Sequence, residues 1–323
     1  MKLFRFVGLL AALALATLSA PASAQNASKF PEKPVTLVVA FGAGGGSDLL
    51  SRTIASTITK YLGQPLIVDL QPGGGGTIAT TQFAKSAKPD GYTLLVVGTG
   101  ATTSVPHSRQ VEYHPIDDFD FVIGITLSTQ LLAVRADFPA NTVQEFIEYA
   151  KANPGTVKLA HTGVGGEDWA MVQLLAKGIG TTFIDVPFDG GGTSATAAAG
   201  GHVDGVIGSL AGVMPFVEAG KLKMLALVNS ERSKSLPDIP TFKELGYTDV
   251  VLDTRLGIAA PKGTPPEILQ KLHDAFKANL EDPSFITLMS RIGLDINYVG
   301  LTDYRDALKG AYERMGTVIP RQQ

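Results

Sequence analysis

Short apolar runs that end in glycine-rich loops recur along the chain. The first run, Val35 to Val39, is a continuous aliphatic stretch, which is typical of a strand buried on both faces. A loop of residues 41–46 follows, and from Leu50 to Leu62 apolar residues recur at the spacing of one helix face. Glycines let the backbone approach a ligand closely, and Ser47 is expected to cap a helix that begins at Asp48. This strand, loop and helix start predict an anion-binding turn.

The same order repeats further along the N-terminal part of the chain. Strands are expected at Leu66 to Leu70 and at Tyr92 to Val97, and each runs into a loop rich in Gly and Thr. Helical patterns alternate with the strands, as in βαβ units with a mostly parallel sheet. In such sheets ligands bind beyond the carboxyl ends of the strands, where these loops gather. One loop is equally well explained as a short connection, but three together favour a binding site.

Two longer apolar runs divide the chain. They are Phe121 to Val134 and Val250 to Ala260, and the alternation of strand, loop and helix begins again between them. We therefore expect two α/β domains joined by two crossing strands. The predicted division gives the first domain residues 25–127 and 253–323, and the inserted second domain residues 128–252.

Residues 1–24 have the features of a secretory signal peptide. Lys2 and Arg5 precede an apolar stretch, and Ala22 to Ala24 form a small-residue cleavage site. We expect cleavage after Ala24 and a mature chain in the periplasm. No later apolar run reaches about 20 residues, which is the length that a membrane helix needs.

The composition argues against several other functions. Lysine and arginine number 27 against 30 aspartate and glutamate residues, so the chain lacks the basic surplus of a nucleic-acid-binding protein. The absence of cysteine excludes a thiol nucleophile, and the five histidines are too scattered for a metal-binding spacing. Gly74, Gly76 and Ala79 match a dinucleotide fingerprint, but the acidic residue expected about 20 positions on is missing. With neither a P-loop nor a G-x-S-x-G motif, we expect no metal, no cofactor and no catalytic residue.

Several stretches together carry a family resemblance. Among them are FGAGGGSD (41–48), LGQPLIVDLQPGGGGTIA (62–79), VPFDGGGTSATAAAGGHVDG (186–205) and GIAAPKGTPPEILQKL (257–272). In this order they resemble the substrate-binding receptors of tripartite tricarboxylate transporters, the Bug-type periplasmic proteins, from Pro31 to about Asp295. The resemblance implies a type II-like Venus-flytrap fold of two α/β domains.

The resemblance also implies a ligand and partners. Members of that family close over a small organic acid and deliver it to the subunits of a membrane permease. The acid would be a mono-, di- or tricarboxylate, an aromatic acid or an acidic amino acid, and unpaired N–H groups at helix starts suit such anions. We expect a monomer without enzymatic activity. A receptor that signals to a membrane sensor is an alternative, and a secreted α/β enzyme is a weaker one because no nucleophile is found.

By this resemblance, loops of both domains would form the ligand site. A carboxylate pincer would consist of two glycine loops, Gly44, Gly45, Gly46, Ser47 and Asp48 with Gly74, Gly75, Gly76 and Thr77. The rest of the first-domain wall would include Thr99 and Thr102. The second domain would contribute Thr162, Gly163, Gly165, Gly166, Asp189, Gly190 and Ser209. His161 would be either a ligand contact or a loop histidine with partners of its own.

Four residues depart from the family pattern. Glu167, Asp168 and Trp169 stand where relatives carry small or hydroxylated residues. The two acids would either complement a helix dipole or face the cleft, where they would repel a second carboxylate and prefer an ammonium or hydroxyl group. Trp169 would either stack on an aromatic acid or pack in the core. Arg255 would either bind a ligand carboxylate through two N–H groups or pair with Asp253.

Overall fold

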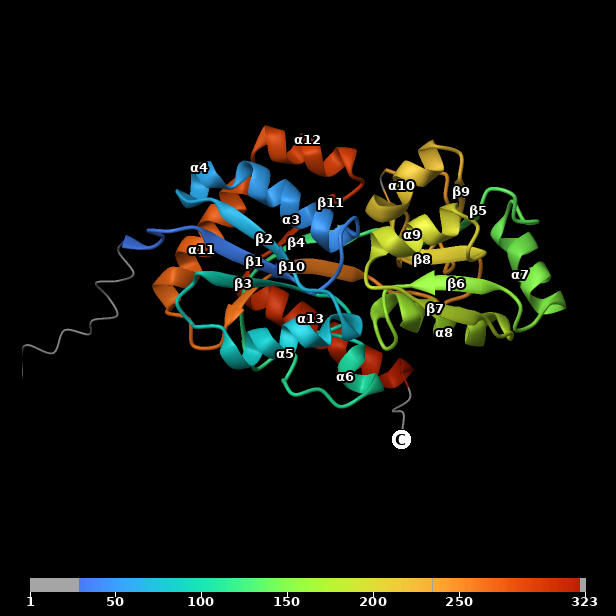
Figure 1. The fold of residues 1–323 in the computed structure, drawn as a ribbon, viewed down its shortest axis with the longest axis horizontal. Helices are drawn as coiled ribbons and strands as arrows, with labels where there is room; N and C mark the ends of the chain where they lie inside the picture. Colours follow the sequence, from blue (N-terminus) through green and yellow to red (C-terminus); the bar gives the residue numbers. More distant parts are fainter. Residues whose placement is uncertain (1–28, 234, 320–323) are drawn as a thin grey trace, which may run out of the picture.

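The computed structural model describes residues 29–233 and 235–319. The predicted signal peptide and its cleavage after Ala24 lie outside the described residues. Two sheets with flanking helices occupy the left and right halves of Figure 1, and we call the parts built on them the first and the second domain. Two α/β units of this kind are what the apolar pattern predicts.

The first sheet has the strand order β11-β4-β10-β3-β1-β2. Its strands are β1 (Val35–Val39), β2 (Leu66–Leu70), β3 (Thr93–Val97), β4 (Phe119–Ser128), β10 (Thr254–Pro261) and β11 (Asp295–Val299). β1 is parallel to β2 and β3, whereas β10 is antiparallel to β3 and β4. The expectation of a mostly parallel sheet is wrong here, because β4 leads out of the domain and β10 leads back into it.

The second sheet has the order β7-β6-β8-β5-β9. Its strands are β5 (Gln130–Arg135), β6 (Lys158–His161), β7 (Ile184–Pro187), β8 (Gly205–Ser209) and β9 (Leu222–Leu227). β6 is parallel to β7 and β8, whereas β5 is antiparallel to β8 and β9. This sheet is therefore mixed as well.

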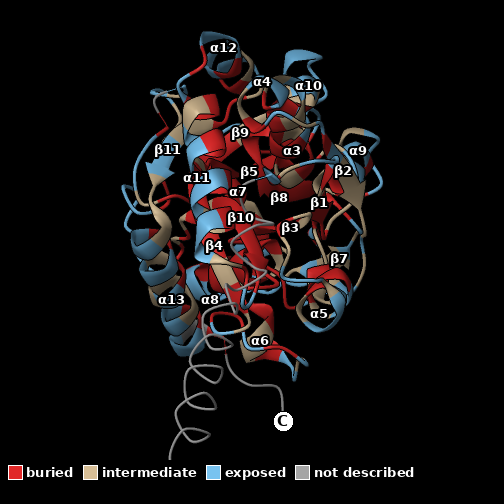
Figure 2. Cartoon of the chain, turned by 90° about the vertical axis from the view of Figure 1, so that its left-hand side faces the viewer, coloured by how far each residue is buried: buried red, intermediate tan, exposed pale blue. Residues whose placement is uncertain are grey.

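Helices cover both sheets, and Figure 2 shows buried strands behind helices whose outer faces are exposed. The first domain has α3 (Gly46–Thr57), α4 (Thr59–Leu62), the 3₁₀ turn η1 (Gly74–Gly76), α5 (Thr77–Ser86), α6 (Val105–Ser108), α11 (Pro266–Leu280), α12 (Pro283–Arg291) and α13 (Leu301–Val318). The second has α7 (Val143–Ala152), α8 (Glu167–Ile179), α9 (Gly191–Ala199) and α10 (Leu210–Glu218). Within the described ranges, no helix combines the length and apolarity needed to cross a membrane.

The helix face predicted after the first glycine loop is confirmed. Leu50, Ile54 and Ile58 are completely buried, because their spacing of four residues places them on one side of the helix. α3 begins at Gly46 with Gly45 as its N-cap, so the prediction that Ser47 caps a helix from Asp48 is wrong. The glycine caps the helix without a side chain, which leaves the first turn open to the cleft.

The chain passes between the sheets at two places. Only Thr129 separates β4 from β5, and the segment after β9 leads back to β10. Asn229 joins the two passes, because its Oδ1 accepts a hydrogen bond from Gln130 N at 2.7 Å and its Nδ2 donates one to Ser128 O at 3.0 Å. These passes support the division of the chain at residues 128 and 252, which stays a proposal.

The C-terminal helix α13 lies against both domains. Tyr304 is buried in the core of the first domain, whereas Met315 and Ile319 belong to the core of the second. The Tyr304 hydroxyl lies 3.0 Å from Arg255 O and 3.3 Å from Val97 O, and these two carbonyl oxygens share its one hydrogen. It therefore joins α13 to the backbone of β10 and β3. The last turn of α13 therefore packs in the core of the second domain, although residues 253–323 were expected to belong to the first domain.

We expect Tyr304→Phe to destabilise the folded chain by roughly 1–2 kcal/mol, because a buried hydrogen bond is lost and two carbonyl groups lose their donor. Urea unfolding followed by circular dichroism measures this change. Tyr149→Phe is the matched control, because Tyr149 is only partly buried on α7 and its hydroxyl forms no hydrogen bond with the described residues, so its change should stay within about 0.5 kcal/mol. An equal loss in both variants would contradict the role assigned to Tyr304.

Candidate functional site

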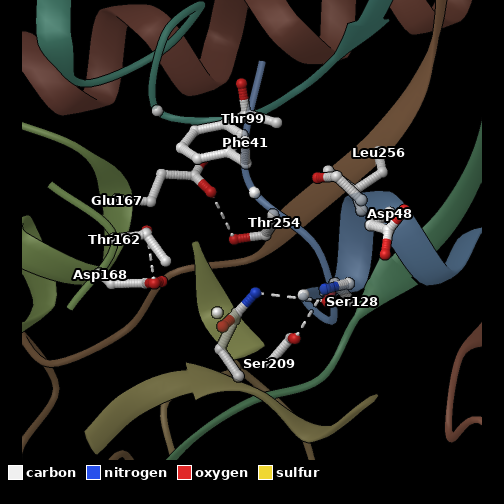
Figure 3. Close-up of a pocket in the computed structure, with 17 residues that line it drawn as sticks. Phe41, Asp48, Thr99, Ser128, Thr162, Glu167, Asp168, Ser209, Thr254 and Leu256 are labelled. Atoms are coloured by element: carbon white, nitrogen blue, oxygen red, sulfur yellow. Dashed lines mark hydrogen bonds between the residues drawn. The ribbon is translucent and has the colours of Figure 1, made fainter. Parts of the chain in front are cut away.

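A cavity of about 60 Å³ lies between the two domains (Figure 3). It is several times larger than the roughly 10–15 Å³ that one water molecule needs. The first domain contributes the loops after β1 and β3, and the second contributes the starts of α8 and α9 together with the end of β8. Polar residues of both crossing segments complete the lining. A cavity of this size with polar residues in its walls suits a small solute.

One wall of the cavity is the start of α3. Residues 45–47 line it, and N–H groups of the first turn lack partners within the helix, where the macrodipole adds partial positive charge. Gly46 N donates a hydrogen bond to Ser209 Oγ of the second domain at 3.1 Å. The charge of the buried Asp48 is offset by Arg52, whose Nε lies 2.7 Å from Asp48 Oδ1. The start of α3 therefore suits an anion.

Another wall carries two buried carboxyl groups, Glu167 and Asp168, in the first turn of α8 (Figure 3). Glu167 accepts hydrogen bonds from the hydroxyls of Thr103 and Thr254, each at 3.0 Å. Asp168 accepts one from Thr162 Oγ1 at 2.6 Å. Burial raises the pKa of Glu167 to about 8 and the pKa of Asp168 to about 6. Glu167 is therefore largely protonated at pH 7. Of the two alternatives for these acids, both hold, because they begin a helix and also face the cleft.

The crossing segments contribute Ser128, Gln130 and Thr254 to the cavity. Gln130 Nε2 donates to Ser128 Oγ at 3.3 Å, while the buried Gln130 Oε1 accepts no hydrogen bond from the described residues. The described side chains that line the cavity include no lysine, arginine or histidine. The side chains on this side of the cavity therefore offer acceptors rather than positive charge.

Glycine segments of the two domains touch backbone to backbone beside the cavity. Gly42 N donates a hydrogen bond to Asp189 O at 2.9 Å. A Cβ atom on Gly190 would lie 2.9 Å from backbone atoms of Gly42, and one on Gly192 would lie 2.4 Å from Ala43 O. Such distances leave no room for a side chain, so the two domains are closed on each other.

The second glycine loop lines a different hollow. Gly74, Gly75 and Gly76 lie there together with Arg109, and this hollow shares only Phe41 and Thr162 with the cavity. A Cβ atom on Gly76 would lie 3.1 Å from Phe41 Cζ, so the aromatic ring fills the space beside the loop. The two loops expected to form one pincer therefore do not meet in one cavity.

The residues expected from the family resemblance fall into three groups. Those that line the cavity are Gly45, Gly46, Ser47, Asp48, Thr99, Thr162 and Ser209. Those that line the second hollow are Gly74, Gly75, Gly76, Thr162, Gly163 and Asp189. Those that line neither are Gly44, Thr77, Thr102, His161, Gly165, Gly166, Gly190 and Arg255. Contact of any of them with a ligand stays a proposal.

Arg255 points away from the cavity. Its neighbours on both sides in β10 line the cavity, and successive side chains of a strand face opposite sides. The Arg255 guanidinium instead donates a hydrogen bond to Asn297 Oδ1. Among the described residues Asp253 accepts hydrogen bonds from Ser230 and forms no ion pair with Arg255, so the alternative pairing is wrong.

His161, Trp169 and Thr102 have structural contacts. His161 is fully buried with its Nε2 3.4 Å from Asp185 Oδ2, and burial lowers the pKa of its imidazole. Trp169 Nε1 donates to Asp185 Oδ2 at 3.1 Å while its ring packs against the second core, as the core alternative predicted. Thr102 Oγ1 accepts a hydrogen bond from Gly98 N at 3.0 Å and so shapes the loop after β3.

Several lining residues were not expected from the sequence. They are Phe41, Ser128, Gln130, Thr254 and Leu256. For Ser128 and Gln130 a signal exists, because they interrupt the first long apolar run where the chain crosses between the domains. Polar residues inside such a buried segment need hydrogen-bond partners, and a solute can supply them.

Comparison with known proteins places the chain in one family. The family model described as tripartite tricarboxylate transporter family receptor matches residues 50–323. The UPF0065 protein in gbd 5'region of Cupriavidus necator is 38% identical over 294 residues, which cover 91% of this chain and 88% of the relative.

Solved structures agree with this match. The periplasmic binding protein BugD has a TM-score of 0.86 at 29% identity, over 91% of this chain and 100% of that chain. MatC from Rhodopseudomonas palustris with bound malate has a TM-score of 0.84 at 31% identity, over 90% of this chain and 99% of that chain. They confirm the two-domain Venus-flytrap fold, and the neighbours are solute-binding receptors rather than enzymes. The chain therefore belongs to the receptors of the tripartite tricarboxylate transporter family, as the sequence motifs predicted.

Proposed function

We propose that this chain captures a small organic carboxylate between its two domains and delivers it to a tripartite tricarboxylate-type membrane permease. The observation that carries the proposal is the cavity between the domains, with the start of α3 in its wall. MatC, which has a similar fold, holds malate, and this supports the choice of a carboxylate.

A carboxylate would help the domains to close. Gly45 precedes α3 in the first domain and Gly191 begins α9 in the second, and a Cβ atom on Gly191 would lie 3.0 Å from Gly45 Cα. Closure therefore brings two positive helix ends together, which repel each other. An anion between them would offset this repulsion and accept hydrogen bonds from their N–H groups. Binding and closure would thus favour each other.

The proposed setting follows from the family. After cleavage behind Ala24, the mature chain would act in the periplasm as a monomer and present its closed form to the permease subunits. A role in sensing would use the same closed form. Growth of a deletion strain on the solute separates the two roles, because transport requires the chain for growth and sensing requires it only for gene induction.

We expect a thermal shift of the chain from Gln25 onward with one class of carboxylate. A ligand at 100 times its Kd adds about 2.7 kcal/mol to the free energy of unfolding. The panel contains mono-, di- and tricarboxylates, aromatic acids and amino acids, with sodium chloride as the ionic control. The protein is unfolded and refolded first to remove carried solute. Conversion of the bound acid into another compound, seen by NMR, would contradict a receptor.

We expect Gly190→Ala to weaken binding of that ligand at least about 10-fold by opposing closure. Gly190 has an extended backbone with φ of −173°, so alanine fits locally, but its Cβ would meet Gly42 in the closed form. Small-angle scattering should show that ligand decreases the radius of gyration of the wild type and not of the variant.

The matched control for this test is Gly310→Ala in α13. A Cβ atom there would meet only the flexible end of Arg314, at 3.4 Å. Both variants should unfold within about 0.5 kcal/mol of the wild type or, for the helical position, slightly above it. If Gly190→Ala bound the ligand and closed like the wild type, the backbone contact would have no part in capture.

A further inference from the structure

The two sides of the cavity offer different hydrogen-bonding groups. The start of α3 offers backbone N–H donors, whereas the start of α8 and the first crossing segment offer side-chain acceptors. Three acceptor side chains gather there, and Glu167, Asp168 and Gln130 are 9%, 8% and 7% exposed. A carboxylate alone would satisfy the α3 side, but it would add no donor for these acceptors, of which Gln130 Oε1 has none.

Each of the three acceptors has unused capacity. The oxygens of Glu167 receive one hydroxyl each, Asp168 receives one side-chain hydroxyl through Oδ2, and Gln130 Oε1 accepts nothing from the described residues. An ionised carboxylate has room for about four hydrogen bonds. The dipole of α8 favours the two carboxylates, but burial outweighs it, since the pKa of each acid is raised. This wall therefore lacks a positive charge, and Gln130 Oε1 lacks a hydrogen-bond donor.

We infer that the solute carries an amino group, whose ammonium form lies against Glu167, Asp168 and Gln130 while its carboxylate lies at the start of α3. This inference rests on the proposed function, because it assumes that a carboxylate fills the α3 side. The solute class is then a small amino carboxylate. An ammonium group has three N–H donors, which matches the three side chains Glu167, Asp168 and Gln130 on this side of the cavity.

A dicarboxylate fits this wall less well. A second carboxylate would need Glu167 to stay protonated and donate its proton, and it would lie beside the charge of Asp168. It could donate nothing to Gln130 Oε1, which would stay buried without a partner. The amino group satisfies all three side chains at once.

The amino group also predicts a direction for proton exchange. The groups that face Glu167 are the hydroxyls of Thr103 and Thr254, the acid Asp168 and the phenol of Tyr304. None of these is a cation, so an arriving ammonium ion favours the ionised form of Glu167 and lowers its pKa. Because that pKa is about 8 before binding, Glu167 gives up its proton when the ligand binds near neutral pH. Affinity must then rise with pH.

The test compares matched acids with and without an amino group, by isothermal titration calorimetry on the refolded chain. The pairs are L-alanine with propionate, 4-aminobutyrate with butyrate, and L-aspartate with succinate. We expect the tightest ligand to be an amino acid that binds at least 10-fold tighter than its partner. Its affinity should rise roughly 10-fold from pH 6.5 to 7.5, and titration in two buffers at pH 7 should show release of about one proton.

Glu167→Gln tests the residue itself. The amide keeps the size of the side chain but removes the charge, so the amino member of the pair should lose at least 10-fold in affinity and most of its pH dependence. The deaminated member should change less than about 3-fold. Glu148→Gln is the matched control, because Glu148 lies exposed on α7 and should alter neither. Unchanged melting temperatures show that both variants fold.

Two results would overturn the inference in different ways. If propionate, butyrate or succinate binds tightest and its affinity falls as pH rises, the chain is a carboxylate receptor whose Glu167 donates a proton, and only the amino group is wrong. If no member of any pair and no acid of the wider panel binds, the proposed function fails as well.

Discussion

The close contact of two glycine segments across the cleft is the constraint on which the closed structure depends. Residues 42–46 and 189–192 approach so closely that a single added methyl group at Gly190 or Gly192 would strike backbone atoms of the other domain. Because no side chains stand between the segments, the starts of α3 and α9 come together at one edge of the cavity. Closure therefore concentrates unsatisfied N–H groups, and it does so at an electrostatic cost that an anion relieves.

The crossing segments solve a related problem of hydrogen bonding. The ladder of β4 ends at Ser128 and that of β5 begins at Gln130, so the backbone between two sheets loses its strand partners. Asn229 supplies a donor to one carbonyl and an acceptor to one N–H group. The same stretch turns polar side chains toward the cavity. The connection between the domains and the floor of the site are thus built from the same residues.

Periodicity predicted the parts of this fold that depend on local sequence. The buried face of Leu50, Ile54 and Ile58 and the two passes between domains were predicted, because apolar spacing and run length report burial directly. The side of β10 on which Arg255 lies was not predicted, since it depends on how the strand pairs with its neighbours. Phe41 lies between the cavity and the second hollow. This position depends on packing between distant parts of the chain, and no local sequence pattern predicts it. The family resemblance placed both glycine loops in one pincer, but whether two loops line the same cavity depends on packing between the domains, which the sequence does not show.

The two acids at the start of α8 set the chemistry of the cavity. A buried carboxylate without a positive partner is unfavourable, and the raised pKa values of Glu167 and Asp168 express this cost. In a site between two domains, this unfavourable free energy is offset only in the bound state, when the solute supplies the missing positive charge. The unfavourable free energy of the two buried acids in the free chain then appears as a difference in affinity between solutes with and without that charge. The acids therefore act on selectivity, whereas the glycine contacts and helix starts act on capture itself.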